Sequence, residues 1–125
     1  SKKRNCLKIL ESMEQQFLYL YQSYVPKYRQ SNWGVLQTTS ILQNAAWFGE
    51  CFCLEEMKRI AEWAKDELLY QLESQIYGDG SHWEQSMMYH IEVLNSVTTM
   101  LVFRKERVWR LRKELRKSCM ECTIM

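Results

Sequence analysis

The sequence has few of the residues that break helices, with one proline and four glycines in 125 residues. Because these two residue types most often end helices and form turns, their scarcity favours long helices over many short strands. No run of about 18 apolar residues occurs, which argues against a membrane-spanning helix. The basic start Ser1-Lys2-Lys3-Arg4 leads into a polar helical pattern and not into the apolar core of a secretory signal.

The chain also lacks a regular cysteine framework. Its five cysteines are an odd number at irregular spacings, which favours reduced thiols over a disulfide scaffold. The pairs Cys51-x-Cys53 and Cys119-x-x-Cys122 could be imagined as a four-thiolate zinc site. Their spacings do not match a common zinc knuckle, however, and the two pairs lie far apart. We therefore expect no metal and no other cofactor.

The composition is that of one packed domain. Hydrophobic residues make up 46% of the chain and aromatic residues 13%, which argues for a globular domain and against disorder. Charge is uneven: residues 104–125 hold eight Lys or Arg against three Glu, whereas the first 103 residues hold nine basic and twelve acidic side chains. This basic segment fits a solvated helix face, and it could also attract an acidic glycan. Nucleic acid is not an expected partner, since Trp109 is its only aromatic residue over 104–117.

Apolar residues spaced three or four positions apart predict helices joined by short loops. The first helix covers residues 5–24, and it ends there because Pro26 disfavours helix at the residue before it. Residues 27–33 are predicted to form a loop. The second helix runs from about 34 to 48, with Gly49 as its terminator.

The third helix is the clearest and extends from Leu54 to Ile76. A fourth covers about 82–103, and a fifth, basic helix covers about 104–119. The apolar face of the fourth helix is predicted to consist of Met87, Ile91, Leu94, Thr98 and Leu101. No stretch alternates as a half-buried strand does. The sequence thus predicts an all-α fold of antiparallel helical hairpins.

The most informative stretch is Asp79-Gly80-Ser81-His82-Trp83-Glu84-Gln85-Ser86-Met87-Met88-Tyr89-His90. Asp-Gly is a strong turn signal, and Ser81 and Glu84 have the spacing of a capping box, so the fourth helix is predicted to begin there. Tyr89 lies off the predicted apolar face and near two histidines, where a phenol can transfer a proton. If the helices alternate in direction, the second and fourth helices start at the same end, which brings Asn32 near Tyr89.

Each of these residues also has a purely structural interpretation. Asn32 precedes the predicted second helix, where asparagine is a favoured N-cap. Glu84 can act as the carboxylate of the capping box alone. Tyr89 can be a core aromatic residue with a tethered hydroxyl, and His90 fits a packing or hydrogen-bonding role better than proton transfer. The residues by themselves leave both interpretations open.

Two parts of the chain together resemble the heparinase II/III and alginate-lyase group of polysaccharide lyases. The first part is Ser31-Asn32-Trp33-Gly34-Val35-Leu36, followed by Glu62-Trp63, Gln71 and Gln75. The second and more specific part is the stretch 79–90, which resembles a signature of the form DG-x-x-x-EQS-x-x-YH. The resemblance covers roughly residues 25–103 and implies that residues 1–125 are a partial (α/α)-toroid domain of about five helices. In the family a β-sandwich domain follows the toroid.

The resemblance implies cleavage of a uronic-acid-containing polysaccharide, heparan-sulfate-like or alginate-like, by β-elimination. Tyr89 matches the general acid, which in some members is also the base, and Asn32 matches the asparagine that contacts the uronate carboxylate. The implied substrate-binding residues are His82, Glu84, Trp33 and Gln85. Removal of the C5 proton is hard beside a charged carboxylate, so a donor on that carboxylate acts as an oxyanion hole does. A phenol, with an ordinary pKa of about 10, is a natural acid toward the departing oxygen.

The chain departs from the family at three places. Trp33 stands where several relatives carry a histidine, and Gly49-Glu50-Cys51-Phe52-Cys53 replaces an apolar, proline-containing connection. The sequence stops at Met125, so we expect an inactive fragment whose uncovered faces could self-associate. The alternative is a non-catalytic helical module that binds an acidic polysaccharide or a protein partner. Relatives are often periplasmic or secreted, and reduced cysteines also allow the cytoplasm, so the compartment stays open.

Overall fold

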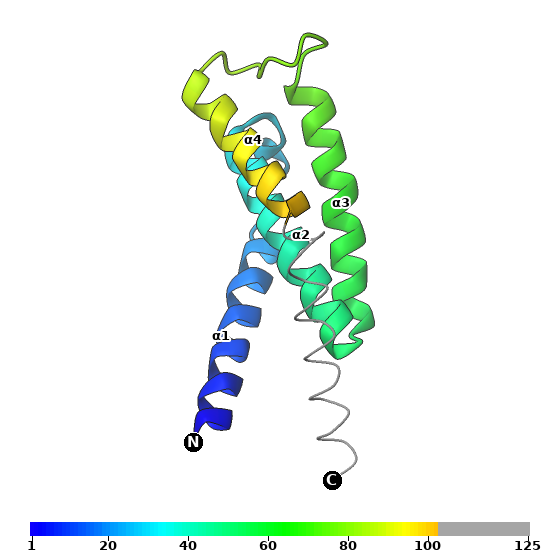
Figure 1. Cartoon of the computed structure of the whole chain (residues 1–125). Helices are drawn as coiled ribbons and strands as arrows, with labels where there is room; N and C mark the ends of the chain where they lie inside the picture. The colour runs from blue at the N-terminus through cyan, green and yellow to red at the C-terminus, as the bar shows by residue number, and fades with distance from the viewer. Residues whose placement is uncertain (103–125) are drawn as a thin grey trace.

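The computed structural model describes residues 1–102, which form four α-helices and one 3₁₀ helix (Figure 1). These residues contain no β-strand, only an isolated bridge between Ile76 and His82. The prediction of an all-α fold is therefore confirmed. The helix predicted over 104–119, and Cys119 and Cys122, lie outside the described residues. No helix within the described part is long and apolar enough to cross a membrane.

The first helix, α1, spans Lys2–Gln22, close to the predicted range 5–24. It begins earlier because the hydroxyl of Ser1 accepts a hydrogen bond from the backbone N of Arg4 at 3.3 Å and caps the first turn. Phe17 is the buried residue of α1, and the turns before it lie largely at the surface. The second half of α1 therefore attaches this helix to the rest of the molecule.

The predicted loop 27–33 contains a short 3₁₀ helix, η1, over Pro26–Gln30. It starts at the proline because the fixed φ of proline suits a first helical position. The backbone of η1 passes so close to the next helix that a Cβ atom at Gly34 would overlap the carbonyl oxygen of Tyr28. Glycine at position 34 is therefore required by the close approach of two backbone segments.

The next two helices are α2, Asn32–Phe52, and α3, Glu55–Gln75. The range of α3 matches its prediction, but the prediction that Gly49 ends α2 is wrong. Gly49 lies inside the helix, where a Cβ atom would come within 3.0 Å of Cγ of Lys58 on α3. It serves the close packing of two helices and not a turn. The helix ends instead at Cys53, which is left-handed with φ 54°.

The last described helix, α4, spans Met87–Val102, so the predicted start near residue 82 is wrong. The capping box does not form, because the hydroxyl of Ser81 bonds within the preceding turn and the carboxylate of Glu84 bonds to another helix. Residues 76–86, called the motif segment below, are not helical. They cross from the end of α3 to the start of α4 (Figure 1).

The buried face of α4 also differs from the prediction. The residues that were predicted to face the core are exposed, namely Met87, Ile91, Leu94, Thr98 and Leu101. The helix packs instead through Val93, Val97 and Met100. Because α4 has apolar residues on more than one side, periodicity could not decide which side faces α2. Self-association through the exposed side stays a prediction.

Helix α2 is the centre of the arrangement and contacts α1, α3, α4 and η1. The buried apolar core draws on every α-helix, with Phe17, Ile41, Phe48, Leu68 and Val93 among its members. The starts of α2 and α4 lie at the same end of the molecule, as alternating helices predict (Figure 1). That end carries the motif segment.

The close approach at Gly34 gives a test of the fold. Gly34→Ala should lower the free energy of unfolding by about 1–3 kcal/mol or more, because the new methyl group meets rigid backbone. Gly78→Ala is the matched control, since a Cβ atom there has no neighbour within 4 Å, and it should change stability by less than about 1 kcal/mol. Urea unfolding measures both. Equal stabilities of the two variants would contradict the observed packing of η1 on α2.

Candidate functional site

A carboxylate attaches the motif segment to the start of α2. Oε1 of Glu84 accepts a hydrogen bond from the backbone N of Asn32 at 2.8 Å, although 52 positions separate the two residues. Ser31 occupies the N-cap position and makes no side-chain capping bond. Glu84 therefore supplies the cap that the local sequence does not, and its charge suits the positive end of the helix dipole. Asn32 is the first helical residue and not the cap.

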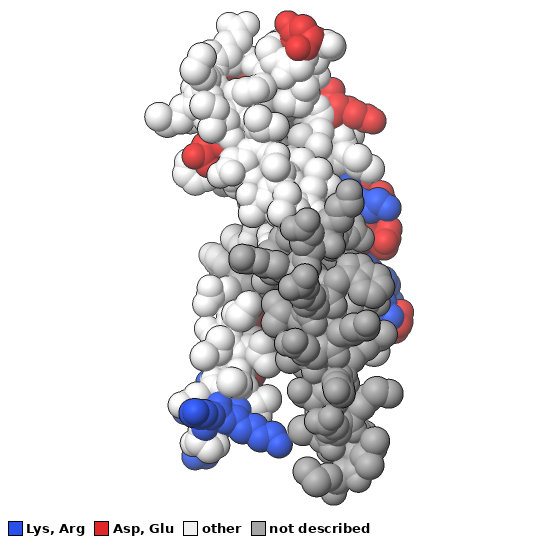
Figure 2. Space-filling model, in the orientation of Figure 1, with Lys and Arg blue, Asp and Glu red and all other residues white. Residues whose placement is uncertain are grey.

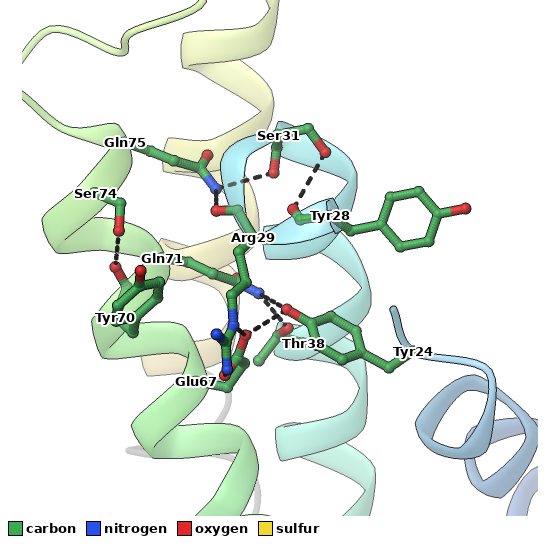
Figure 3. Close-up of polar contacts among 10 residues, drawn as sticks. All are labelled: Tyr24, Tyr28, Arg29, Ser31, Thr38, Glu67, Tyr70, Gln71, Ser74 and Gln75. Atoms are coloured by element: carbon green, nitrogen blue, oxygen red, sulfur yellow. Dashed lines mark hydrogen bonds and ion pairs between the residues drawn. The ribbon is translucent and has the colours of Figure 1, made fainter. Parts of the chain in front are cut away.

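The buried amide of Gln75 holds the same end of the molecule together. Its Nε2 donates to the carbonyl oxygens of Arg29 and Ser31, at 2.6 and 3.0 Å (Figure 3). Its Oε1 lies 2.8 Å from Nε2 of His82. One side chain near the end of α3 therefore bonds to η1, to the residue before α2 and to the motif segment.

These contacts fix the protonation of His82. The backbone N of Glu84 donates to Nδ1 of His82 at 3.3 Å, so Nδ1 carries no proton and Nε2 donates to Gln75. His82 is 2% exposed, and burial lowers the pKa of this histidine below its usual value, although the charge of Glu84 works in the opposite direction. The ring is therefore neutral at pH 7, with both nitrogens engaged.

A second, partly buried polar cluster anchors η1 to α3 (Figure 3). Arg29 donates from Nε and Nη2 to the two carboxylate oxygens of Glu67, at 2.6 and 3.0 Å, and the hydroxyl of Tyr24 donates to Oε1 at 2.5 Å. Nε2 of Gln71 donates to Tyr24 and to Thr38. Burial alone would raise the pKa of Glu67, but the donors Arg29 and Tyr24 hold it below its usual value. Burial and the bond to Glu67 raise the pKa of Tyr24 to about 12. The cluster is thus a charged structural anchor.

The two predicted catalytic residues differ in environment. Asn32 is 6% exposed, and no hydrogen bond of its side chain occurs among the described residues. Tyr89 lies in the first turn of α4 and is 42% exposed, so the interpretation as a core aromatic residue does not hold. The backbone N of Tyr89 lies 3.5 Å from Oγ of Ser86, which precedes α4. Both residues lie at the same end of the molecule, and no bond joins them directly.

The four residues predicted to bind substrate have different environments in the structure. His82 is buried and Glu84 is half-buried, both in contacts that fasten the motif segment. Trp33 projects from the first turn of α2 and is 70% exposed. Gln85 is exposed and has a left-handed backbone with φ 53°, which is uncommon for a side chain of its size and typical of functional segments.

A cavity of about 580 Å³ opens between the motif segment and the start of α4. Its lining includes Tyr77, Asp79, His82, Gln85 and His90, and neither Asn32 nor Tyr89 belongs to it. Volumes of roughly 300–1,000 Å³ are typical of small-ligand sites. The end of the molecule that carries the predicted residues therefore also carries a cavity of the size of a small-ligand site.

Sequence reasoning gave Gln75 no role, although it connects the site. A signal was present: the buried positions of α3 include Met57, Ile60, Ala64, Glu67, Gln71 and Gln75. The last three are polar residues that continue an apolar stripe at helical spacing. Since buried polar groups are almost always hydrogen-bonded, such a continuation indicates a polar network inside the fold.

Metal binding finds no support in the described part of the chain. No group of three or more His, Cys, Asp or Glu in residues 1–102 is arranged to hold a metal ion. Cys51 is buried and Cys53 is exposed. The other cysteine pair of the imagined zinc site lies outside the described residues.

Comparison with known proteins gives one family. The sequence model described as heparinase II/III N-terminus matches residues 3–121 of this chain. No curated protein and no solved structure matches at the significance required.

The cap across α2 predicts the effect of changing Glu84. Glu84→Ala leaves the backbone N of Asn32 without its acceptor and should lower the free energy of unfolding by about 0.5–2 kcal/mol, as loss of an N-cap does. Glu84→Gln keeps an acceptor oxygen and should retain most of that stability. Glu73→Ala, an exposed carboxylate on α3, is the control. Urea unfolding and amide exchange at Asn32 measure the effect, and unchanged exchange in Glu84→Ala would contradict the cap.

Burial of neutral His82 predicts a pH dependence. Because its folded pKa lies below the unfolded value of 6.5, the unfolded chain binds the proton first as the pH falls. The contribution of His82 to the free energy of unfolding should thus be constant above about pH 6.5. It should decrease as the pH is lowered from there toward the folded pKa. His82→Gln should lose this decrease, whereas the control His90→Gln should keep it. Identical pH profiles of wild type and His82→Gln in urea unfolding would contradict the assignment.

Proposed function

Because the chain belongs to the heparinase II/III N-terminal family, we propose that it supplies catalytic groups of a polysaccharide lyase. The reaction is β-elimination in a glycan that contains uronic acid. Tyr89 is the general acid, and also the base if one group performs both transfers. Asn32 binds the carboxylate of the uronate. Membership of the family relates the chain to polysaccharide lyases, and the residue roles and the substrate are the proposal.

The observation that carries the proposal is the bond from Glu84 to the backbone of Asn32. It fastens the segment that precedes Tyr89 to the residue proposed to bind the carboxylate. Catalysis of this kind requires that the groups be held before the substrate arrives, because positioning supplies much of the rate. The bonds of His82 and Gln75 hold the same segment from a second point.

The environment of Asn32 supports its role. Asn32 is 6% exposed and its side-chain amide makes no hydrogen bond to another described residue, so its N–H groups can donate to a bound carboxylate. A neutral donor also serves the chemistry, since negative charge grows on the uronate carboxylate as the C5 proton leaves. The side-chain amide of Asn32 is such a neutral donor.

The position of Tyr89 supports proton transfer. It lies in the first turn of α4 with its ring partly exposed, so its hydroxyl is accessible to a ligand. In the elimination, the electron pair of the C5–H bond forms the C4–C5 double bond while the bond from C4 to the bridging oxygen breaks. If Tyr89 performs both transfers, its phenolate takes the C5 proton, and the phenol so formed delivers that proton to the bridging oxygen, which leaves as a neutral hydroxyl. If Tyr89 is the acid alone, a separate base takes the C5 proton and Tyr89 protonates the leaving oxygen.

Loss of the Tyr89 hydroxyl tests the proposal in the full-length gene product. Tyr89→Phe keeps the ring, so the fold and the substrate affinity should be retained. The turnover rate should fall by about 10²–10⁴, the usual contribution of a general acid or base. The product is a 4,5-unsaturated uronate, which is followed by ultraviolet absorbance. Tyr19→Phe, on the surface of α1, is the control. A wild-type rate in Tyr89→Phe would contradict the assignment.

A second pair of variants tests Asn32. Asn32→Ala should lower the turnover rate by about 10²–10³, as loss of one oxyanion donor does. Asn32→Asp has nearly the same shape but places a negative charge beside the uronate, so it should be at least as damaging. Circular dichroism establishes that both variants fold. An active Asn32→Asp enzyme would be incompatible with carboxylate binding at this position.

A further inference from the structure

The cavity of about 580 Å³ beside the motif segment is not explained by the proposed chemistry, since it contains neither Asn32 nor Tyr89. Its walls come from the Asp-Gly turn, from the residues just before α4 and from the first turn of that helix. The polar side chains that line it are a phenol, two imidazoles, a carboxylate, an amide and two hydroxyls. Such a mixture at a concave surface is typical of a site for a small polar ligand.

The walls of the cavity are fixed by bonds within the chain. Oδ1 of Asp79 accepts from the backbone N of Ser81 at 2.9 Å and from its hydroxyl at 2.7 Å. Two backbone bonds close the turn, from Tyr77 N to Ser81 O and from Gly80 N to Tyr77 O. The bond between His82 and Gln75 holds the floor. A ligand would thus meet a preformed surface, which lowers the entropy cost of binding.

The charges of the cavity exclude an acidic ligand. The bonds from Ser81, first through its hydroxyl and then through its backbone N, hold the pKa of Asp79 below its usual value, so this carboxylate is charged at pH 7. His82 is neutral and has both ring nitrogens engaged. No Lys or Arg is among the described residues that line the cavity.

The face of the molecule shown in Figure 2 agrees with this charge distribution. Acidic side chains lie at the end formed by the motif segment, and basic ones gather around the start of α1. An anionic group in the cavity would meet the carboxylate of Asp79, and no Lys or Arg of the described lining compensates that charge. Hydroxyl groups, by contrast, can donate to Asp79 and can exchange hydrogen bonds with Gln85 and Ser86.

The apolar part of the lining completes the description of the ligand. Tyr77 is half-exposed and Met87 is 80% exposed, so both offer apolar surface to the solvent side of the cavity. A sugar ring has the matching character, with an apolar face of C–H groups and a rim of hydroxyls. The side chain of Gln85 reaches this cavity from a left-handed backbone position, which is maintained at a cost.

We propose that this cavity binds an uncharged sugar ring, as a subsite separate from the Asn32–Tyr89 pair. The choice of a saccharide rests on the proposed function, and the choice of an uncharged one rests on Asp79 and on the lack of Lys and Arg in the described lining of the cavity. A glycan that fills both places has a uronate at Asn32 and a neutral unit in the cavity. A polymer made of uronates alone does not meet this requirement.

The test is a titration of the ¹⁵N-labelled 125-residue chain, followed by NMR, with two probes that differ only in charge. These are methyl β-D-glucopyranoside and methyl β-D-glucopyranosiduronic acid. We expect the uncharged glucoside to give saturable shifts at residues 77–90 with a dissociation constant in the millimolar range. The glucuronide should bind at least about fivefold more weakly at pH 7. Equal or tighter binding of the glucuronide, or no saturable shift up to about 50 mM glucoside, would overturn the proposal.

Two variants with controls locate the site. Tyr77→Ala should weaken glucoside binding several-fold, whereas Tyr70→Ala, a tyrosine of similar exposure outside the cavity, should not. Asp79→Asn keeps an oxygen that can accept from Ser81 and removes the charge, so the preference for the glucoside over the glucuronide should shrink. A preference unchanged in Asp79→Asn would overturn the electrostatic argument.

The outcome is separable from that of the lyase proposal. If Tyr89→Phe inactivates the full-length enzyme but the chain does not bind the glucoside, the proposed subsite is wrong and the proposed reaction stands. If the glucoside binds at residues 77–90 but the Tyr89→Phe enzyme is fully active, the subsite stands and the assignment of Tyr89 as general acid is wrong.

Discussion

The candidate site depends on the buried side-chain amide of Gln75. Its nitrogen holds the carbonyls of Arg29 and Ser31, and its oxygen accepts from His82. These partners belong to η1, to the residue before α2 and to the motif segment, which are far apart in sequence. Because a buried amide that loses a partner keeps its desolvation cost, the bonds stabilise one another. The geometry at this end of the molecule is therefore set from the end of α3.

A consequence is that the start of α2 is completed from a distance. Ser31 leaves the first N–H group of the helix without a side-chain cap, and Glu84 fills that place from the motif segment. The spacing of Ser81 and Glu84 is typical of a local helix start, but Glu84 instead makes a contact between two segments that are distant in the sequence. The same contact links the two residues proposed for the elimination chemistry. It reaches Asn32 through the capped backbone and Tyr89 through the segment that leads into α4.

Asn32 and the cavity differ in what they can bind. Asn32 offers an uncharged amide without a protein partner among the described residues. The cavity offers a charged Asp79 and neutral donors and acceptors. Since no Lys or Arg is among the described residues that line the cavity, recognition there relies on hydrogen bonds and not on attraction to a cation. A glycan of mixed charge suits such a pair of environments.

The sequence by itself determined the helical class, the extent of α3 and the approximate extent of α1, because helical spacing acts over a few residues. The roles of Asn32, Glu84 and Tyr89 in a site stay predictions. The sequence did not determine where α4 begins, which of its faces is buried, or the connecting role of Gln75. Ser81 and Glu84 satisfy a capping box on their own, and apolar residues cover more than one side of α4. Only the tertiary structure decided these points, because the uncapped N–H of Asn32 offered Glu84 a donor on another helix, and packing against α2 selected one apolar side of α4.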